Sequence, residues 1–242
     1  MRQPDVEVFL NMISKEFKPT LFHPYYFIRN QLLKSIRVYA PHLKGNLLDF
    51  GCGSKPYKEI FTVETYVGVD FINEGHPHDN EQIDVFYDGK TIPFPDNFFD
   101  SILSSEVFEH IFNLSEILVE LNRLLKPGGK ILITCPFVWK EHELPHDYAR
   151  YTLFALRDLL EKNNFTVLVT DKSGNFIQVI FQLVTLYFHD TFYSRTKGIP
   201  VIRELFEFVF FFIPNLFGTI ANKLFPSKKQ LYFNNIIVAE KR

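Results

Sequence analysis

Short apolar runs alternate with helical stretches through the middle of this chain. The sequence predicts strands over residues 47–50, 66–70, 101–104, 130–134, 166–170 and 231–240, and helices over 114–125 and 153–162. Such an alternation is typical of an α/β fold with a parallel, doubly wound sheet. Sheets of this kind bind ligands in the crevice at the carboxyl ends of their strands. Functional residues are therefore expected directly after each predicted strand.

The first predicted strand ends in a glycine-rich turn. It delivers Asp49, and the chain then passes through Gly51, Cys52 and Gly53. Glycines at such a turn let the backbone approach a ligand that a Cβ atom would keep away. A helix that starts after the turn would also offer free N–H groups to the ligand. By itself, a glycine pair after a strand also fits a tight turn with no ligand.

The next strand ends in an acid, Asp70, about 20 residues after the first turn, which is where an acid can hold ribose hydroxyls. The three-glycine pattern of dinucleotide-binding folds is absent, because position 56 is proline. The turn therefore favours a nucleoside without phosphates over a pyrophosphate-containing cofactor, and it disfavours a nucleotide-dependent oxidoreductase.

Residues 49–54 resemble the glycine-rich loop of class I S-adenosylmethionine-dependent methyltransferases, of the type 11 methyltransferase domain family. Residues 66–70, 88–100 and 123–129 resemble three further motifs of the family, in the family's order. The resemblance covers residues 43–172 and the last strand. It implies a Rossmann-like, seven-stranded, mostly parallel sheet and S-adenosylmethionine as the cofactor.

The resemblance also assigns cofactor-binding roles. The residues concerned are Asp49, Gly51, Cys52, Gly53, Asp70, Phe71, Asp88, Gly89 and Ser105. Asp49 would face the amino-acid end of the cofactor, Asp70 its ribose and Asp88 its adenine amino group. Phe71 would stack on the adenine or pack in the core, and Cys52 would fill space in the turn. Asp70 and Asp88 also fit ordinary surface carboxylates at strand ends.

Methyl transfer needs chiefly alignment of the acceptor, and an acceptor of high pKa also needs a base. Glu106 follows the strand over 101–104, where the resemblance places the methionine part or the acceptor. His146 beside Asp147 is the second candidate base, and Arg150 is suited to an acceptor phosphate or carboxylate. In the alternative interpretation, Asp147 and Thr152 cap the following helix.

Two further observations concern the same loops. Glu109 and His110 are a further candidate base at the ligand-binding edge, and in the alternative interpretation His110 orients the start of a helix. His142, His146 and Asp147 do not have the sequence spacing that is typical of metal-ligating residues. We therefore predict no metal site.

Residues 173–230 interrupt the strand–helix rhythm and form a predicted helical insertion before the last strand. Phenylalanine makes up 11 of these 58 residues and 17 of the other 184. Polar residues on the first insertion helix form one narrow stripe: Gln178, Gln182 and Thr185. A second helix over 201–213 is expected to end at Pro214, and 216–225 to form a third. The insertion holds six basic and three acidic residues, so the sequence leaves open a membrane contact, a lid or a homodimer interface.

Charge and apolar run lengths limit the partners and the location. There are 26 basic and 28 acidic residues, which gives no basic field for nucleic acid. Charges such as Asp5 and Glu7 interrupt any signal-peptide core. The longest apolar run in the last third, 208–213, is far shorter than the about 20 residues that span a bilayer. The expected location is the cytoplasm, either free or peripheral at the inner face of the membrane.

The sequence therefore predicts three parts: an N-terminal helical segment (1–45), a methyltransferase core (46–172 and 231–242) and an aromatic-rich helical insertion (173–230). The predicted reaction is transfer of a methyl group to an oxygen, or a nitrogen, of a small molecule, a sugar or a lipid-linked saccharide. A quinone or other lipid acceptor is the first alternative. A non-catalytic S-adenosylmethionine-binding partner subunit is the second.

Overall fold

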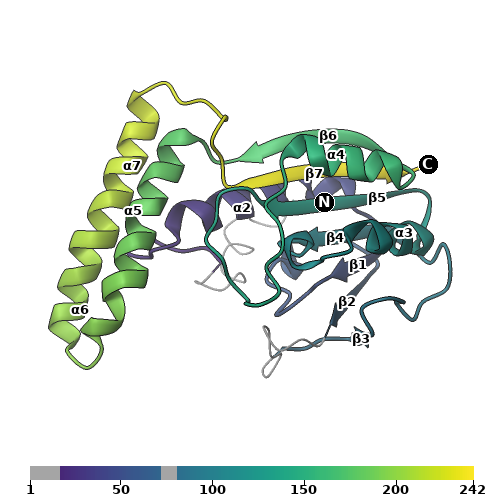
Figure 1. Cartoon of the computed structure of the whole chain (residues 1–242), viewed down its shortest axis with the longest axis horizontal. Coiled ribbons are helices and arrows are strands. Elements are labelled where there is room, and N and C mark those ends of the chain that lie inside the picture. The colour runs from purple at the N-terminus through teal and green to yellow at the C-terminus, as the bar shows by residue number, and fades with distance from the viewer. Residues whose placement is uncertain (1–16, 72–80) are drawn as a thin grey trace, which may run out of the picture. The chain divides into compact units, whose positions relative to one another are not determined.

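The computed structural model describes residues 17–71 and 81–242, which divide into two compact units (Figure 1). Residues 17–34 and Lys172–Phe233 form a helical unit. Within the described ranges, Ser35–Asp171 and Asn234–Arg242 form an α/β unit. The first 16 residues of the predicted N-terminal segment, with Asp5 and Glu7, lie outside the described residues.

The α/β unit is built on a seven-stranded sheet in the order β3-β2-β1-β4-β5-β7-β6. The strands are β1 (Asn46–Phe50), β2 (Thr65–Phe71), β3 (Val85–Tyr87), β4 (Phe99–Ser105), β5 (Leu125–Pro136), β6 (Phe165–Ser173) and β7 (Asn234–Lys241). The pairs from β3 to β5 are parallel, and β7 runs antiparallel to β5. The predicted mostly parallel, doubly wound sheet is confirmed.

The antiparallel direction of β7 has a consequence for the site. Asn234, the first residue of β7, pairs with Pro136, the last residue of β5. The start of β7 therefore lies at the same sheet edge as the carboxyl ends of the parallel strands. An asparagine from the end of the chain joins the residues that follow β1, β2 and β4.

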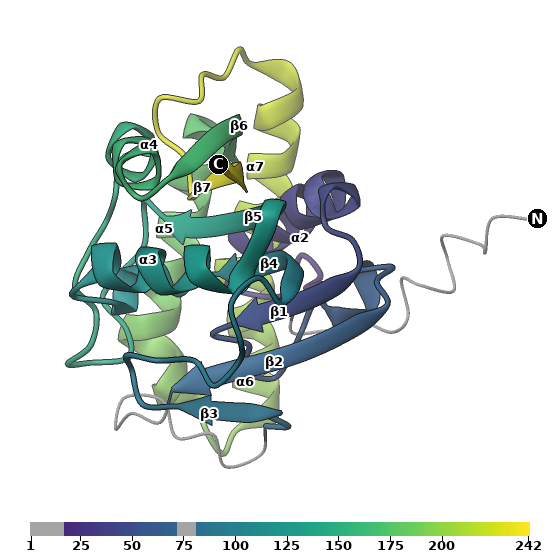
Figure 2. The ribbon, with the colours of Figure 1, turned by 90° about the vertical axis from the view of Figure 1, so that its right-hand side faces the viewer.

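Helices cover the sheet on both faces (Figure 2). The apolar sides of α3 (Leu114–Leu124) and α4 (Leu153–Lys162) pack in one cluster with alternate residues of the strands, including Leu48, Ile102 and Ile133. The last turn of α2 (Tyr26–Tyr39) and η1 (Ala40–His42) lie at the other face. Thr152 accepts a hydrogen bond from the Ala155 N–H (3.2 Å), which confirms it as the N-cap of α4. Burial on both faces explains why the central strands read as continuous apolar runs.

The helical unit contains a hairpin of two apolar helical runs. The first run is α5 (Phe176–Phe192), followed by η4 (Tyr193–Thr196). The second contains α6 (Pro200–Glu207), a π-helical turn η5 (Phe208–Phe212) and α7 (Ile213–Leu224). The helices α5 and α7 lie side by side (Figure 1), and Asn175 at the start of α5 donates to Asn222 near the end of α7 (2.7 Å).

The predicted end of the second insertion helix at Pro214 is wrong. Proline lacks an N–H, and its ring collides with the carbonyl four residues earlier in a regular helix. The π-helical turn precedes Pro214, and there the N–H of Ile213 donates to the carbonyl of Phe208, five residues earlier. This wider turn carries the proline without ending the helix. The two predicted helices therefore form one run, Pro200–Leu224.

The joined run changes the conclusion drawn from apolar run length. Within the described part of the chain, Pro200–Leu224 is one helix that is long and apolar enough to cross a membrane, by length and composition. It has 25 residues, and 17% of its most apolar 18-residue window is buried. The unbroken apolar run 208–213 is shorter than this helix. The charged residues of α6 and Pro214 interrupt the apolar sequence, but they do not interrupt the helix.

Candidate functional site

The turn after β1 needs glycine for its backbone conformation and its packing. Gly51 has a φ of 71°, and a Cβ atom there would lie 2.3 Å from Val107 Cγ2. The Gly51 N–H donates to the carbonyl of Val69 in β2 (2.9 Å). Gly53 also has a positive φ, 44°. The thiol of Cys52 is buried in this turn and fills space, as predicted.

The ends of β1 and β2 are joined by the Asp70 carboxylate. Its Oδ2 accepts the N–H of Gly53 (2.8 Å), and its Oδ1 accepts the N–H of Phe71 (2.8 Å). The glycine turn and the acid, which the family resemblance assigns to the same cofactor, are therefore in direct contact. This contact fixes the carboxylate at the sheet edge beside the glycine turn.

Phe71, Asp88 and Gly89 gather at the ends of β2 and β3. The Phe71 ring is partly exposed and packs edge-on against Tyr87, with ring centroids 5.8 Å apart. A Cβ atom on Gly89 would lie 3.0 Å from that ring. Asp88 Oδ1 accepts the N–H groups of Lys90 (2.8 Å) and Thr91 (2.7 Å), which hold the pKa of this exposed carboxyl below its usual range. An aromatic face and a carboxylate thus lie together where the sequence placed the adenine.

Asp49 is buried at the end of β1 and accepts a hydrogen bond from the hydroxyl of Tyr66 in β2. Burial raises the pKa of Asp49 to about 7. A carboxyl of this kind favours a cationic partner, because a positive charge offsets the cost of its own ionisation. The sequence did not single out Tyr66, since a tyrosine on a central strand has the pattern of core packing.

A chain of hydrogen bonds connects β4, β5 and β7 at the same edge. Ser105 and Thr134 share a hydrogen bond between their hydroxyls (2.9 Å), and Thr134 donates to Glu106 Oε1 (2.7 Å). Asn234 Nδ2 donates to the other oxygen, Glu106 Oε2 (2.6 Å). Desolvation of the buried carboxyl raises the pKa of Glu106 to about 7, although both hydrogen bonds lower it. Glu106 therefore exchanges protons close to neutral pH, as a general base does.

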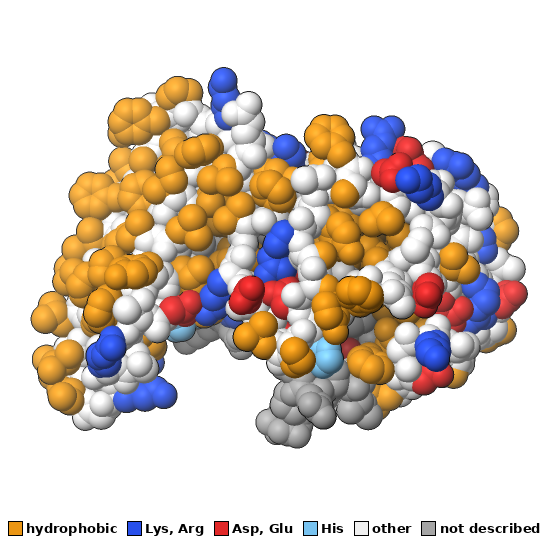
Figure 3. Space-filling view, in the orientation of Figure 1, with side chains coloured by type: hydrophobic (Ala, Val, Ile, Leu, Met, Phe, Trp, Pro, Cys, Tyr) orange, Lys and Arg blue, Asp and Glu red, His pale blue; other side chains and the backbone are white. Residues whose placement is uncertain are grey.

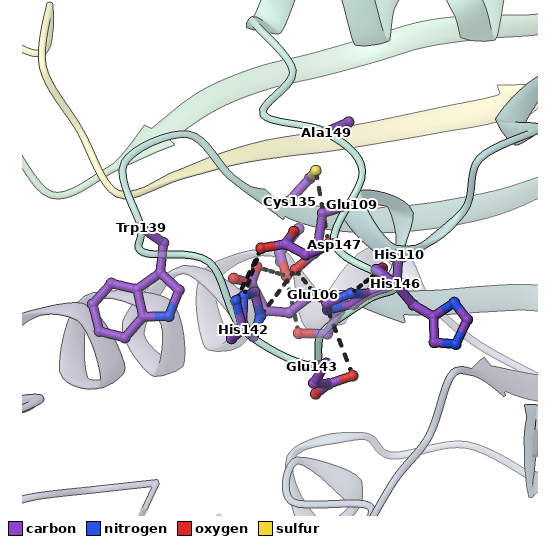
Figure 4. Close-up of polar contacts among 12 residues, drawn as sticks. Glu106, Glu109, His110, Cys135, Trp139, His142, Glu143, His146, Asp147 and Ala149 are labelled. Carbon is purple, nitrogen blue, oxygen red and sulfur yellow. Dashed lines mark hydrogen bonds and ion pairs between the residues drawn. The ribbon is translucent and has the colours of Figure 1, made fainter. Parts of the chain in front are cut away.

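The loop between β5 and α4 is organised by an ion pair. Arg150 contacts both carboxylate oxygens of Asp147, with Nη1–Oδ1 at 2.6 Å and Nη2–Oδ2 at 2.7 Å. Asp147 also accepts the N–H of His142 (3.0 Å), and these contacts lower its pKa to about 2. The His146 ring is directed away from Glu106 and Glu109 (Figure 4), and its Nδ1 lies 2.9 Å from the Tyr148 hydroxyl.

The structure thus places the predicted site residues in two groups, one at the sheet edge and one in the β5–α4 loop. The nine predicted cofactor residues and Glu106 follow β1 to β4 at one sheet edge. His146 and Asp147 are in the β5–α4 loop, where Asp147 is committed to Arg150 and His146 to Tyr148. Tyr66, Thr134 and Asn234 contact the site residues and were missed, because their partners are 17, 28 and 128 positions away in the sequence.

Comparisons with known proteins bear on the family and the fold. A family model described as a methyltransferase domain matches residues 26–170, which is more than half of the chain. The ubiquinone/menaquinone biosynthesis C-methyltransferase UbiE of Cupriavidus taiwanensis is 36% identical over 61 residues, which make up 25% of this chain and 25% of that protein. The match therefore spans about a quarter of the length of that relative.

Solved structures share the fold. A S-adenosylmethionine-dependent methyltransferase from Archaeoglobus fulgidus superposes with a TM-score of 0.54 at 19% identity, over 98% of this chain and 100% of that one. The phosphoethanolamine N-methyltransferase 2 of Haemonchus contortus, solved in complex with S-adenosyl-L-methionine, gives a TM-score of 0.51 at 16% identity over 95% of this chain and 60% of that one. At these identities the likeness concerns the fold.

Proposed function

The chain belongs to the S-adenosylmethionine-dependent methyltransferase family, and from that premise we propose that it methylates a hydroxyl group on a lipid-linked acceptor, with a lipid-linked saccharide as the favoured class. Bound S-adenosylmethionine supplies an activated methyl group on a sulfonium. The chain's own residues then have to bind the nucleoside, orient the acceptor and accept its proton. Oxygen is favoured over nitrogen because a buried carboxyl is available as the base.

The described residues fit the cofactor. Asp70 accepts the N–H of Gly53 in the glycine turn, and the Phe71 ring and Asp88 lie at the neighbouring strand ends. The raised pKa of Asp49 suits the cationic amino-acid end of the cofactor. Glu106 is held by Thr134 and Asn234 and would take the acceptor proton, and Ser105 would position the acceptor or the methionine part.

The observation that supports a lipid-linked acceptor is the distribution of polar and apolar side chains in the helical unit. Gln182 Oε1 accepts the N–H groups of Phe27 and Ile28 (both 3.1 Å), and Thr185 donates to the carbonyl of Pro24 (2.8 Å). Asn215 on α7 is likewise fully buried and donates to the carbonyl of Leu21 (2.8 Å). The polar stripe of each helix therefore faces the interior of its own unit.

The outward sides of the same helices are apolar. Exposed apolar residues on α5 are Phe176, Ile180, Leu183, Val184, Tyr187 and Phe192. Those on the second run are Val201, Ile202, Leu205, Phe208, Val209, Leu216, Phe217, Ile220 and Leu224. Figure 3 shows hydrophobic side chains gathered over α5 and α7. A helix pair with polar groups inside and apolar groups outside is suited to a hydrocarbon surrounding.

Charged residues at the two ends of the hairpin favour insertion into one leaflet. Arg195 and Lys197 lie between the helices, and Lys223, Lys228 and Lys229 lie at or after the end of α7. Moving such side chains through the bilayer centre costs about 2.5–3.5 kcal/mol each. The 17 residues of α5 are also fewer than the about 20 needed to span. In one leaflet, both basic ends reach anionic headgroups and the apolar sides enter the acyl region.

The expected result of flotation with vesicles tests this placement. The full chain should float with vesicles of phosphatidylcholine and phosphatidylglycerol, more strongly at 50 mM than at about 500 mM salt, because screening weakens the headgroup contacts. Val201→Glu/Leu205→Glu/Phe217→Glu should lower the partition coefficient at least about 100-fold, since each buried apolar side chain contributes about 1.5–3 kcal/mol.

A matched triple variant on the α/β unit serves as the control. Val38, Val119 and Phe154 are exposed apolar residues there, and their replacement by glutamate should leave flotation unchanged. Equal flotation of the two triple variants would overturn the leaflet placement. The wild-type chain could instead stay at the bottom of the gradient as a dimer that Val201→Glu/Leu205→Glu/Phe217→Glu disrupts. That result would assign the apolar surface to a second copy of the chain.

A further inference from the structure

Three metal-ligating side chains meet beside the predicted base. Glu109 and His110 come from η3 (Phe108–His110) after β4, and His142 comes from the loop after β5. One donor atom of each lies within 4.8 Å of the donors of the other two. Among the described residues this is the one such group of three. Figure 4 shows both imidazoles directed toward Glu109.

The buried carboxylate is the unusual member of the group. The Glu109 side chain is fully buried, and its Oε1 has no hydrogen-bond partner. His110 Nε2 is also buried without a hydrogen-bond partner. Buried polar atoms are nearly always satisfied, because leaving one unpaired costs roughly 1–3 kcal/mol or more. Two unsatisfied atoms that face each other indicate a ligand between them.

The distances suit a cation after a small contraction. Glu109 Oε1 lies 3.7 Å from His110 Nε2 and 3.9 Å from His142 Nε2. Donors that share one cation at about 2.1 Å are separated by roughly 3.0–3.4 Å. The two carboxylate–imidazole distances therefore have to shorten by roughly 0.3–0.9 Å for the donors to share one cation.

The second nitrogen of each histidine faces an oxygen. His110 Nδ1 lies 2.9 Å from the carbonyl of His146 and therefore carries the proton, which leaves the lone pair on Nε2. His142 Nδ1 lies 3.3 Å from Asp147 Oδ2, within ion-pair range although not aligned as a hydrogen bond. Such outer oxygens set the tautomer and orientation of metal-ligating histidines.

The surrounding loop is fixed independently of any ion. The Asp147–Arg150 pair holds the carboxylate behind His142, and the N–H groups of Tyr148 (2.8 Å) and Ala149 (3.2 Å) donate to the carbonyl of Glu109. The loop that carries His142 is thereby attached to the segment that carries Glu109. The three donors are held together before a ligand arrives.

We propose that Glu109, His110 and His142 bind one divalent first-row transition-metal ion. Two imidazoles and one carboxylate favour zinc, manganese or iron(II) over magnesium or calcium, which take oxygen ligands. This set differs from His142, His146 and Asp147, for which the sequence spacing predicts no metal site. Glu143 Oε2, 3.7 Å from His110 Nε2, is the nearest further oxygen for the remaining positions.

The place of the site gives the ion a role that rests on the proposed function. Only Val107 separates Glu106 from η3, so the ion would lie close to the predicted base. A cation with open positions can hold an acceptor oxygen and lower its pKa. The ion would thus orient the hydroxyl that receives the methyl group.

The test measures metal binding alone, without cofactor or acceptor, so that its failure is distinct from failure of the proposed function. Tag-free wild-type protein stripped with a chelator should take up one equivalent of Zn²⁺ or Mn²⁺ in calorimetry and gain thermal stability. Magnesium at the same concentration should bind at least about 100-fold more weakly. His142→Gln and His110→Gln should each weaken Zn²⁺ binding at least about 30-fold, with circular dichroism confirming the fold.

His146→Gln is the matched control, because this neighbouring ring points away from the group. It should bind zinc with wild-type affinity. The proposal is overturned if the folded wild-type protein binds no equivalent of either ion. It is equally overturned if His146→Gln weakens binding as much as His142→Gln, because the zinc would then be held by other histidines.

Discussion

Replacement of Asp70 by alanine is expected to raise the dissociation constant for S-adenosylmethionine roughly 100-fold or more. The family resemblance gives this carboxylate the two ribose hydroxyls, and hydrogen bonds to a charged group contribute about 1.5–3 kcal/mol each. The same substitution removes the acceptor of the Gly53 N–H, which holds the glycine turn against β2. Equilibrium dialysis with labelled cofactor measures the change.

Two other aspartates calibrate the Asp70 result. Asp88→Ala should weaken binding less, by about tenfold, because Asp88 is fully exposed and water competes for its hydrogen bonds. Asp158→Ala, on the outer side of α4 in a surface pair with Lys162, should leave binding unchanged. Cofactor binding by Asp70→Ala within threefold of wild type would remove Asp70 from the ribose site.

Glu106→Gln is expected to lower the methyl-transfer rate by about 100- to 1,000-fold while leaving cofactor binding within about threefold. General bases contribute on this scale, and glutamine keeps the shape but cannot take a proton. The pKa of Glu106 is about 7, and only its ionised form accepts a proton. The wild-type rate should therefore rise with pH through about 7 and level off above it, and the variant should lack this rise.

Asn234 provides a readout that a purely structural role would not give. Its amide donates to Glu106 and lowers the pKa of that carboxyl. Asn234→Ala should therefore move the rising limb of the rate profile to higher pH, with a similar plateau. A variant Glu106→Gln that keeps the wild-type rate and the same limb would exclude Glu106 as the base.

Local patterns made much of the fold predictable. The strand–turn–strand unit from β1 to β2 is written in one stretch of sequence: Asp49, the two glycines and Asp70 follow each other within about 20 residues. The helix α3 shows its buried side as apolar residues at helical spacing. By contrast, β3 has three residues, Val85–Tyr87, with no run long enough to register as a strand.

Contacts between distant residues were not predictable from one sequence. Asn234 reaches Glu106 only because β7 enters the sheet antiparallel to β5, and the sequence carries no sign of that proximity. Likewise, Glu109 and His142 each appeared as candidate residues, but their meeting depends on the loop fixed by Asp147 and Arg150. A site built from two loops therefore depends on tertiary structure and cannot be predicted from local sequence patterns.

In the helical unit, the sequence did not predict which side of each helix faces outward. The stripe of Gln178, Gln182 and Thr185 was visible in the sequence, and its usual interpretation is a solvent-facing side. In the structure the three side chains are buried, and Gln182 and Thr185 bond the backbone of residues 24–28. Helical periodicity gives the angle between polar and apolar sides, but it does not say which side faces outward.

The most direct measurement of the central claim is calorimetry of the folded wild-type chain with S-adenosylmethionine and S-adenosylhomocysteine, followed by incubation of the chain with methyl-labelled cofactor and a membrane lipid extract. We predict one-to-one binding of both nucleosides and transfer of label into the lipid-linked fraction, which is lost in Glu106→Gln. Absence of binding for both nucleosides by folded protein would contradict the enzyme assignment. Binding with label transferred only to water-soluble acceptors would contradict the lipid-linked acceptor.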